Sequence, residues 1–230
     1  MWIDPYYLLC MAPAFLATLA AQWYVKSAFN KWSRVPLHSR LSGAEAAQRL
    51  IQYAGLHGVR VEAVNGMLTD HYDPRSKVLR LSPTVYQGRS VASVAVAAHE
   101  LGHALQDKEG YAPLKLRTMM VPAVNIGSYL GWVLIFLGLM LNWLNLATVG
   151  LVVFSVGAIF ALITLPVEFN ASARAKQLLQ ETGIVQTTEE VRGVNTVLNA
   201  AALTYVAALF NAIMQLLYFA MLIFGGRRRR

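Results

Sequence analysis

Charged residues along this chain are separated by three long uncharged intervals that are mostly apolar. They cover residues 5–25, 118–167 and 193–226. A helix needs about 20 apolar residues to cross the hydrocarbon core of a bilayer, so the first and last intervals each predict one transmembrane helix. The middle interval is 50 residues long and predicts two such helices, joined by a turn near Asn142 and Asn145. The pattern therefore predicts about four transmembrane helices.

The polar segment between the first two intervals predicts a small water-facing domain. Ser42 and Glu45 have the spacing of a capping box, which predicts a helix that reaches about Tyr53. Alternating apolar and polar residues predict two short β-strands, at 59–64 and 77–82. A second continuous helix is expected at residues 90–107, which are rich in Ala, Val and Leu and contain no proline.

Composition supports the same membrane assignment. Hydrophobic residues make up 56% of the chain and charged residues 14%, whereas about a quarter of the residues of a soluble protein are charged. The net charge of +8 predicts contact with anionic lipid. No basic motif with interleaved aromatic residues and no glycine-rich phosphate loop occurs, so we expect no nucleic-acid partner. Cys10 is the only cysteine, which excludes an intramolecular disulfide.

The helix predicted at residues 90–107 contains the motif HExxH, formed by His99, Glu100 and His103. Residues four apart lie on one helix face, so both imidazoles can reach one metal ion. Zn²⁺ is the expected ion, because catalytic zinc sites take three protein ligands and keep a place for a water whose pKa falls to about 7. Glu100 lies beside the first ligand, where its carboxylate can take a proton from that water. This is the chemistry of a metallopeptidase.

A third protein ligand must come from another part of the chain. The other histidines are His38, His57 and His71, and only 12 residues are acidic. Glu168 is the first charged residue after fifty uncharged ones, at a membrane boundary where an unpaired carboxylate costs several kcal/mol. The predicted hairpin would return Glu168 to the membrane face that carries the motif. The structural alternative is an interfacial glutamate that pairs with Arg174 or with a lipid headgroup.

Three further predictions concern the elements around the motif. Residues 168–182 are expected to form a separate helix, whose N-terminal dipole favours the carboxylate of Glu168. The strand at 77–82 leads into the motif helix, so we expect its edge to pair with an extended substrate peptide. His71, in the loop between the two strands, and Tyr111 are candidate donors to the oxyanion of the reaction.

Four stretches of the sequence carry a family resemblance: AAHELGHALQ, LTDHYDPRSKVLRLSP, GYAPLKLR and LPVEFNASARA. Together they are similar to the YugP-like neutral zinc metallopeptidases of bacterial membranes, over nearly the whole chain, and more remotely they resemble the HtpX-type gluzincins. The resemblance implies that His99, His103 and Glu168 bind Zn²⁺. It implies Glu100 as the general base. Ser172 stands where HtpX-type enzymes have aspartate, so no carboxylate behind the metal ligands is implied.

The predicted fold is a predominantly α-helical polytopic membrane protein with a small α+β zincin-like catalytic domain. Its expected parts are a transmembrane anchor (1–25), the catalytic domain with the HExxH helix (26–120), a transmembrane hairpin (121–166), a helix with the third metal ligand (167–192), a transmembrane helix (193–226) and a basic tail (227–230).

The expected location is the bacterial cell membrane, with protein or peptide substrates. Lys26, Lys31 and Arg34 follow the first span, so the positive-inside rule predicts a cytoplasmic catalytic domain with both termini outside. Arg227–Arg230 favour the reverse orientation. The first helix usually dominates the orientation, and we therefore favour the cytoplasmic assignment.

Two other functions are compatible with HExxH in a membrane protein. A site-2-type intramembrane protease carries the motif inside a membrane helix and completes its site with a later Asp-Gly; no Asp-Gly occurs here, and Lys108 and Glu109 end the motif helix. A catalytically silent scaffold could retain a structural zinc, but such sites usually have four Cys or His ligands. The sequence therefore favours a membrane-anchored zinc endopeptidase.

Overall fold

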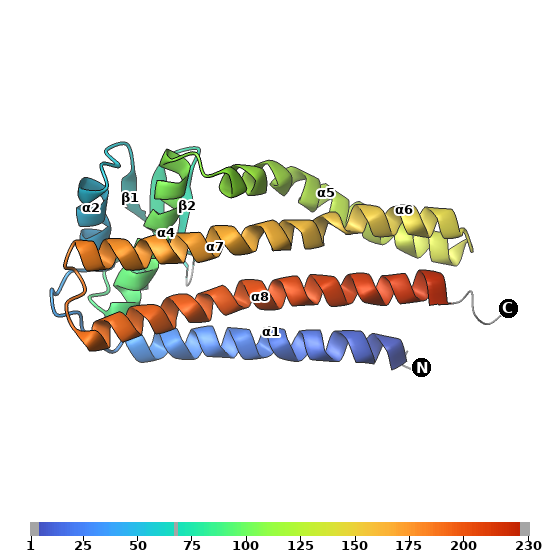
Figure 1. Ribbon diagram of the computed structural model, residues 1–230, viewed down its shortest axis with the longest axis horizontal. Coiled ribbons are helices and arrows are strands. Elements are labelled where there is room, and N and C mark those ends of the chain that lie inside the picture. The colour runs from blue at the N-terminus through green and yellow to red at the C-terminus, as the bar shows by residue number, and fades with distance from the viewer. Residues whose placement is uncertain (1–4, 67–68, 226–230) are drawn as a thin grey trace. The chain divides into compact units, whose positions relative to one another are not determined.

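The computed structural model describes residues 5–66 and 69–225, and helices make up most of it (Figure 1). The chain divides into two compact units. One contains the residues up to Ala21, Lys115–Leu165 and the residues from Thr204, and the other contains Gln22–Leu114 and Pro166–Leu203. The second unit includes the HExxH motif and Glu168.

Four helical stretches in the described residues are long and apolar enough to cross a membrane, judged by length and composition. They confirm the predicted predominantly α-helical membrane fold. In chain order they are α1 (Pro5–Trp32), α5 (Ala112–Met140), α6 with α7 (Leu144–Phe154 and Val156–Glu181) and α8 (Thr188–Gly225).

The first unit contains the predicted hairpin, in which α5 is followed by a tight turn at Asn142 and then by α6. Asn142 has a φ of 52°, a left-handed conformation that asparagine adopts more readily than most residues. Glycines let the helices approach closely. A Cβ at Gly131 would lie 2.6 Å from the backbone N of Phe154, and one at Gly138 would lie 2.3 Å from that of Ala147. Close packing through small residues is typical of helices in lipid.

Residues 168–181 are helical, as predicted, but the prediction that this helix begins at Glu168 is wrong, because Glu168 lies in the interior of α7. Proline often ends or kinks a helix, but Pro166 is accommodated inside α7. The residues that follow it include Ala, Leu and Gln, which favour continued helix. The break in helical structure instead falls at Ser155, between α6 and α7. The N-terminal dipole of a helix therefore does not act on Glu168.

The second unit contains a three-stranded sheet in the order β1-β3-β2, with β1 parallel and β2 antiparallel to β3. Both predicted strands are present, but the expectation of a free edge on the second is wrong, because β3 is the central strand and is paired on both sides. Its residues Val78, Leu79 and Leu81 are buried. His71, expected in a loop, lies in the edge strand β2. The bounds are β1 (Arg60–Ala63), β2 (His71–Asp73) and β3 (Val78–Leu81).

Helix α4 (Val91–Lys108) is the centre of this unit, and its Ala, Val and Leu side chains are buried against α2 (Gly43–Tyr53), α3 (Pro83–Tyr86) and the sheet. The predicted capping box of α2 is confirmed: Ser42 N donates to Glu45 Oε2 at 2.7 Å, and Glu45 N donates to Ser42 Oγ at 3.2 Å. A Cβ at Gly102 would lie 2.4 Å from the carbonyl oxygen of Ala171. Only glycine therefore allows α4 and α7 to approach this closely.

Candidate metal centre

The HExxH motif lies on α4, and its two histidines project from one face of the helix. The helix starts at the N-cap Ser90, whose hydroxyl accepts a hydrogen bond from Ser93 N. The rings of His99 and His103 have centroids 4.9 Å apart and are inclined at 85° to each other. Both side chains are largely buried, so their positions are set by packing.

Glu168 on α7 brings a carboxylate to these two imidazoles. It is 1% exposed, and its Oε2 lies 3.2 Å from His99 Nε2 and 3.6 Å from His103 Nε2. One candidate ligand atom of each residue lies within 4.8 Å of the others. The alternative pairing with Arg174 is wrong, since Arg174 instead makes two hydrogen bonds to Glu109, of 2.7 and 2.6 Å.

The donor set of this cluster fits zinc. His99 Nδ1 lies 3.1 Å from Ser172 Oγ, and His103 Nδ1 lies 3.0 Å from Gln106 Oε1. When each Nδ1 carries the ring proton, both Nε2 lone pairs face the carboxylate of Glu168. Two imidazole nitrogens and one carboxylate oxygen form a ligand set found in catalytic zinc sites, where a fourth position is left for water. Among the residues that the structure describes, His99, His103 and Glu168 form the group of three metal-binding side chains that could hold an ion.

Comparison with known proteins agrees with this chemistry. Residues 7–224 match the family described as "Putative neutral zinc metallopeptidase". The chain belongs to this zinc metallopeptidase family. One similar relative is "Putative membrane protease YugP" of Bacillus subtilis (strain 168), which is 50% identical over 207 residues that cover 90% of this chain and 92% of the relative. No solved structure matches the chain.

In this member of the zinc metallopeptidase family, the two histidines face Glu168, whereas Glu100 contacts the edge strand β2. Its Oε2 accepts a hydrogen bond of 3.1 Å from the backbone N–H of Tyr72, on the edge strand β2. Burial raises the pKa of Glu100, while the nearby imidazoles of His99 and His103 act in the opposite direction. The structure thus holds a partly buried carboxylate beside the candidate ligands, in an environment that increases its affinity for a proton.

The other predicted site residues lie outside the three-residue cluster. His71 is exposed, and its Nδ1 lies 2.7 Å from the carbonyl oxygen of Thr69. Tyr111 donates its backbone N–H to the carbonyl of Gln106 at 2.8 Å, just after α4. Whether either side chain stabilises an oxyanion stays a prediction.

Sequence reasoning assigned no role to Tyr72, Gln106 or Asn170. Gln106 lies three residues after His103 on α4, a spacing at which two helix side chains meet, and this was a signal that could have identified it. Tyr72 contacts Glu100 through its backbone N–H, which its residue type does not indicate. Asn170 bonds to Gln106 across 64 residues of chain, a contact that only the packing of α4 on α7 produces.

Proposed function

We propose that this protein is a membrane-anchored zinc endopeptidase that hydrolyses peptide bonds with Glu100 as the general base. The observation that carries this proposal is the buried cluster of His99, His103 and Glu168, with Glu100 beside it on α4. Membership of a zinc metallopeptidase family supports the same reaction.

In the proposed reaction, His99, His103 and Glu168 hold the ion through two imidazole nitrogens and one carboxylate oxygen. Zinc bound there would supply a Lewis acid that polarises the scissile carbonyl and lowers the pKa of water. The carboxylate of Glu100 accepts a proton from the attacking water and later gives it to the leaving amine. The raised pKa of Glu100 suits both steps, because it brings proton uptake closer to neutral pH.

The sheet supports a proposal for the place of the substrate backbone. β2 is an edge strand, and the N–H of Tyr72 points out of the sheet towards Glu100. An extended peptide that pairs with this edge would pass beside the general base. We therefore propose that the substrate peptide pairs with β2, and not with β3, which is paired on both sides. We also propose that the catalytic unit faces the cytoplasm, in accordance with the basic residues that follow the first span.

The test is the variant Glu100→Gln, measured for zinc content and for cleavage of an unfolded protein. The amide has nearly the shape of the carboxylate but cannot accept the proton, so we expect normal zinc content and a loss of about 10²–10⁴-fold in kcat. Glu62→Gln, an exposed glutamate on β1, is the matched control and should cleave as the wild type does. Undiminished cleavage by Glu100→Gln would contradict the mechanism.

A further inference from the structure

We propose that Gln106 is a positioning residue that fixes the tautomer of His103 and so directs its Nε2 lone pair to the metal. This inference rests on the proposed ligand set and adds to it a residue that controls one of the ligands. The helix carrying a metal ligand would then also carry the group that decides where the ligand's proton lies.

Gln106 has no exposed surface, and its amide is fully engaged. Its Oε1 lies 3.0 Å from His103 Nδ1. Its Nε2 donates to the carbonyl oxygen of Val167 at 2.8 Å and to Asn170 Oδ1 at 3.0 Å. A buried side chain with three polar contacts, one of them to a candidate metal ligand, does more than fill space.

The orientation of this amide follows from its partners. An amide could be turned so that its oxygen and nitrogen exchange places, but the carbonyl of Val167 can only accept a hydrogen bond. Asn170 is fixed independently, because Arg174 Nε, which can only donate, lies 2.7 Å from Asn170 Oδ1. Gln106 therefore faces two acceptors and must present its NH₂ group to both.

The opposite end of the amide then determines the state of His103. With its NH₂ group towards α7, Gln106 presents Oε1, a pure acceptor, to His103 Nδ1. Nδ1 must therefore carry the proton, and in a neutral imidazole the other nitrogen is then unprotonated. His103 Nε2, 3.6 Å from Glu168 Oε2, is left with its lone pair free for a metal ion.

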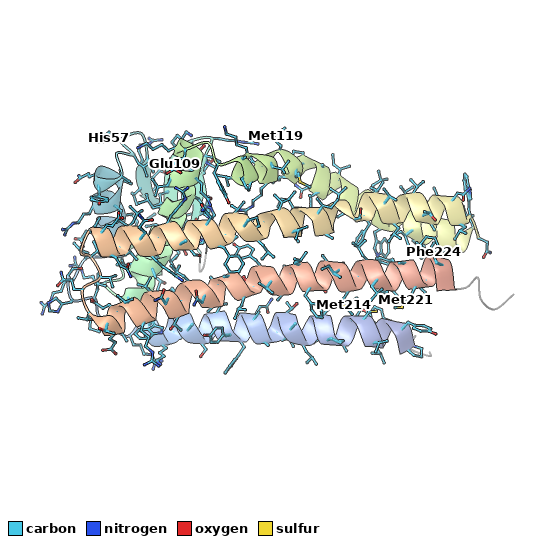
Figure 2. The ribbon with its side chains drawn as sticks, in the orientation of Figure 1. His57, Glu109, Met119, Met214, Met221 and Phe224 are labelled. Carbon is cyan, nitrogen blue, oxygen red and sulfur yellow. The ribbon has the colours of Figure 1, made fainter. Side chains whose placement is uncertain are left out.

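The series of hydrogen bonds that begins at His103 on α4 ends at Glu109, at the end of the same helix. Arg174 holds Asn170 with Nε and uses both terminal nitrogens on Glu109, at 2.7 and 2.6 Å. Glu109 lies at the end of α4 (Figure 2). The series from His103 through Gln106, Asn170 and Arg174 to Glu109 thus connects both helices and lets neither amide turn.

His99 has a different kind of partner. Its Nδ1 faces the hydroxyl of Ser172 at 3.1 Å, and a hydroxyl can donate or accept. Ser172 alone therefore does not determine which nitrogen of His99 carries the proton. Of the two candidate histidine ligands, His103 is the one whose tautomer is imposed by its surroundings.

The test compares Gln106→Met with Gln106→Glu by titrating each purified full-length protein with Zn²⁺ against a chelating dye. Methionine has similar length but no strong acceptor, so we expect zinc affinity to fall by about 10- to 100-fold. Glutamate keeps an acceptor for His103 Nδ1, and in its protonated form its other oxygen can still donate to the carbonyl of Val167, so its zinc affinity should remain closer to the wild type. If Gln106 served only packing, the order would be reversed, because methionine suits a buried site and glutamate does not.

A spectroscopic measurement and a second pair of variants complete the test. With Co²⁺ in place of Zn²⁺, Gln106→Met should change the visible absorption of the bound ion, since one ligand is no longer oriented, whereas Gln106→Glu should preserve its pattern. Asn170→Asp keeps the acceptor that Gln106 and Arg174 share, and Asn170→Leu removes it, so only the leucine variant should weaken zinc binding. This pair decides the question if Gln106→Glu does not fold.

His103→Ala separates this proposal from the proposed function. If His103→Ala loses zinc while Gln106→Met binds it with wild-type affinity and an unchanged Co²⁺ spectrum, the positioning role of Gln106 is wrong and the metal centre stands. If His103→Ala itself binds zinc as tightly as the wild type, the ligand assignment is wrong, and the role of Gln106 is lost with it.

Discussion

Tyr72 contacts the motif helix in two ways. Its backbone N–H donates to Glu100, and its phenol hydroxyl donates to Asp107 Oδ2 at 2.7 Å. Lys77 also pairs with Asp107. Burial, together with the hydrogen bond to Asp107, raises the pKa of Tyr72 far above its usual value, so the phenol stays protonated and remains a donor. The two contacts with α4 fix β2 beside the proposed general base.

Two variants at position 72 distinguish the backbone contact of Tyr72 from its side-chain contact, because both lose the phenol and only one also loses the N–H. Tyr72→Pro removes the N–H that holds Glu100, and an edge strand accepts proline where the N–H points out of the sheet. We expect kcat to fall by about 10- to 100-fold, part of what a positioned base contributes. Zinc content should not change, since Tyr72 is no ligand. Tyr72→Ala loses the phenol as Tyr72→Pro does but keeps the N–H, and it should retain a kcat close to that of the wild type; an equal loss in both variants would show that the side chain, not the N–H, matters.

Sequence reasoning identified residues that have a characteristic local spacing or an unusual environment. His99 and His103 are one helical turn apart, and Glu168 stands out after fifty uncharged residues. The structure brings all three together. Gln106 had the local spacing from His103, but Asn170 gave no such signal, because polar amides are common near membrane boundaries and its contact with Gln106 depends on how α4 packs on α7.

At the scale of elements, the differences from prediction have local causes. The helix expected to begin at Glu168 already begins at Val156 and continues through Pro166, and no glycine or further proline follows until Gly183. β2 has three residues, too few for an alternating pattern to be recognised. Without β2, the second predicted strand had no visible partner on one side and was assigned a free edge.

α7 combines an apolar, membrane-type sequence with Glu168, the proposed third metal ligand. Variants of Glu168 therefore test whether this helix contributes to the metal site. We expect Glu168→Ala to lower zinc content and abolish cleavage together, because two imidazoles alone hold zinc weakly. Glu168→Asp, shorter by one methylene, should keep partial metal binding with impaired turnover. Zinc content by elemental analysis and cleavage of an unfolded protein measure the two effects.

Two glutamates outside the cluster provide the controls for Glu168. Glu181→Ala and Glu189→Ala should change neither zinc content nor cleavage, since both side chains are exposed. If Glu168→Ala kept full zinc occupancy and wild-type cleavage, Glu168 would not be a ligand. His71 would then be the next residue to test.

At the scale of the whole molecule, the basic residues at the end of α1 bear on orientation. Among the residues that the structure describes, neither Lys26 nor Arg34 pairs with an acidic side chain, and Lys31 lies over the ring of Trp32 at 5.4 Å. Unpaired cations beside an apolar span are typical of the cytoplasmic membrane surface. We therefore expect this end of α1 to lie in the cytoplasm.

Cysteine labelling tests that orientation in a Cys10→Ala background, which removes the one natural thiol. Lys31→Cys should react with a membrane-impermeant reagent only after the cells are opened. Leu141→Cys, in the turn between α5 and α6 and 63% exposed, should react on intact cells, because one further span separates it from the catalytic segment. The opposite pattern for the two cysteines would reverse the assignment.

The position of Glu168 on α7 also has a consequence for biosynthesis. Glu168 follows His99 by 69 residues, so at about 5–20 residues per second the ribosome adds it roughly 3–14 s later. The intervening chain consists largely of α5 and α6, which must enter the bilayer before α7 can follow. If His99, His103 and Glu168 are the ligands, a nascent chain has no complete zinc site until Glu168 has been synthesised. Its proteolytic activity would begin only after the hairpin has been inserted.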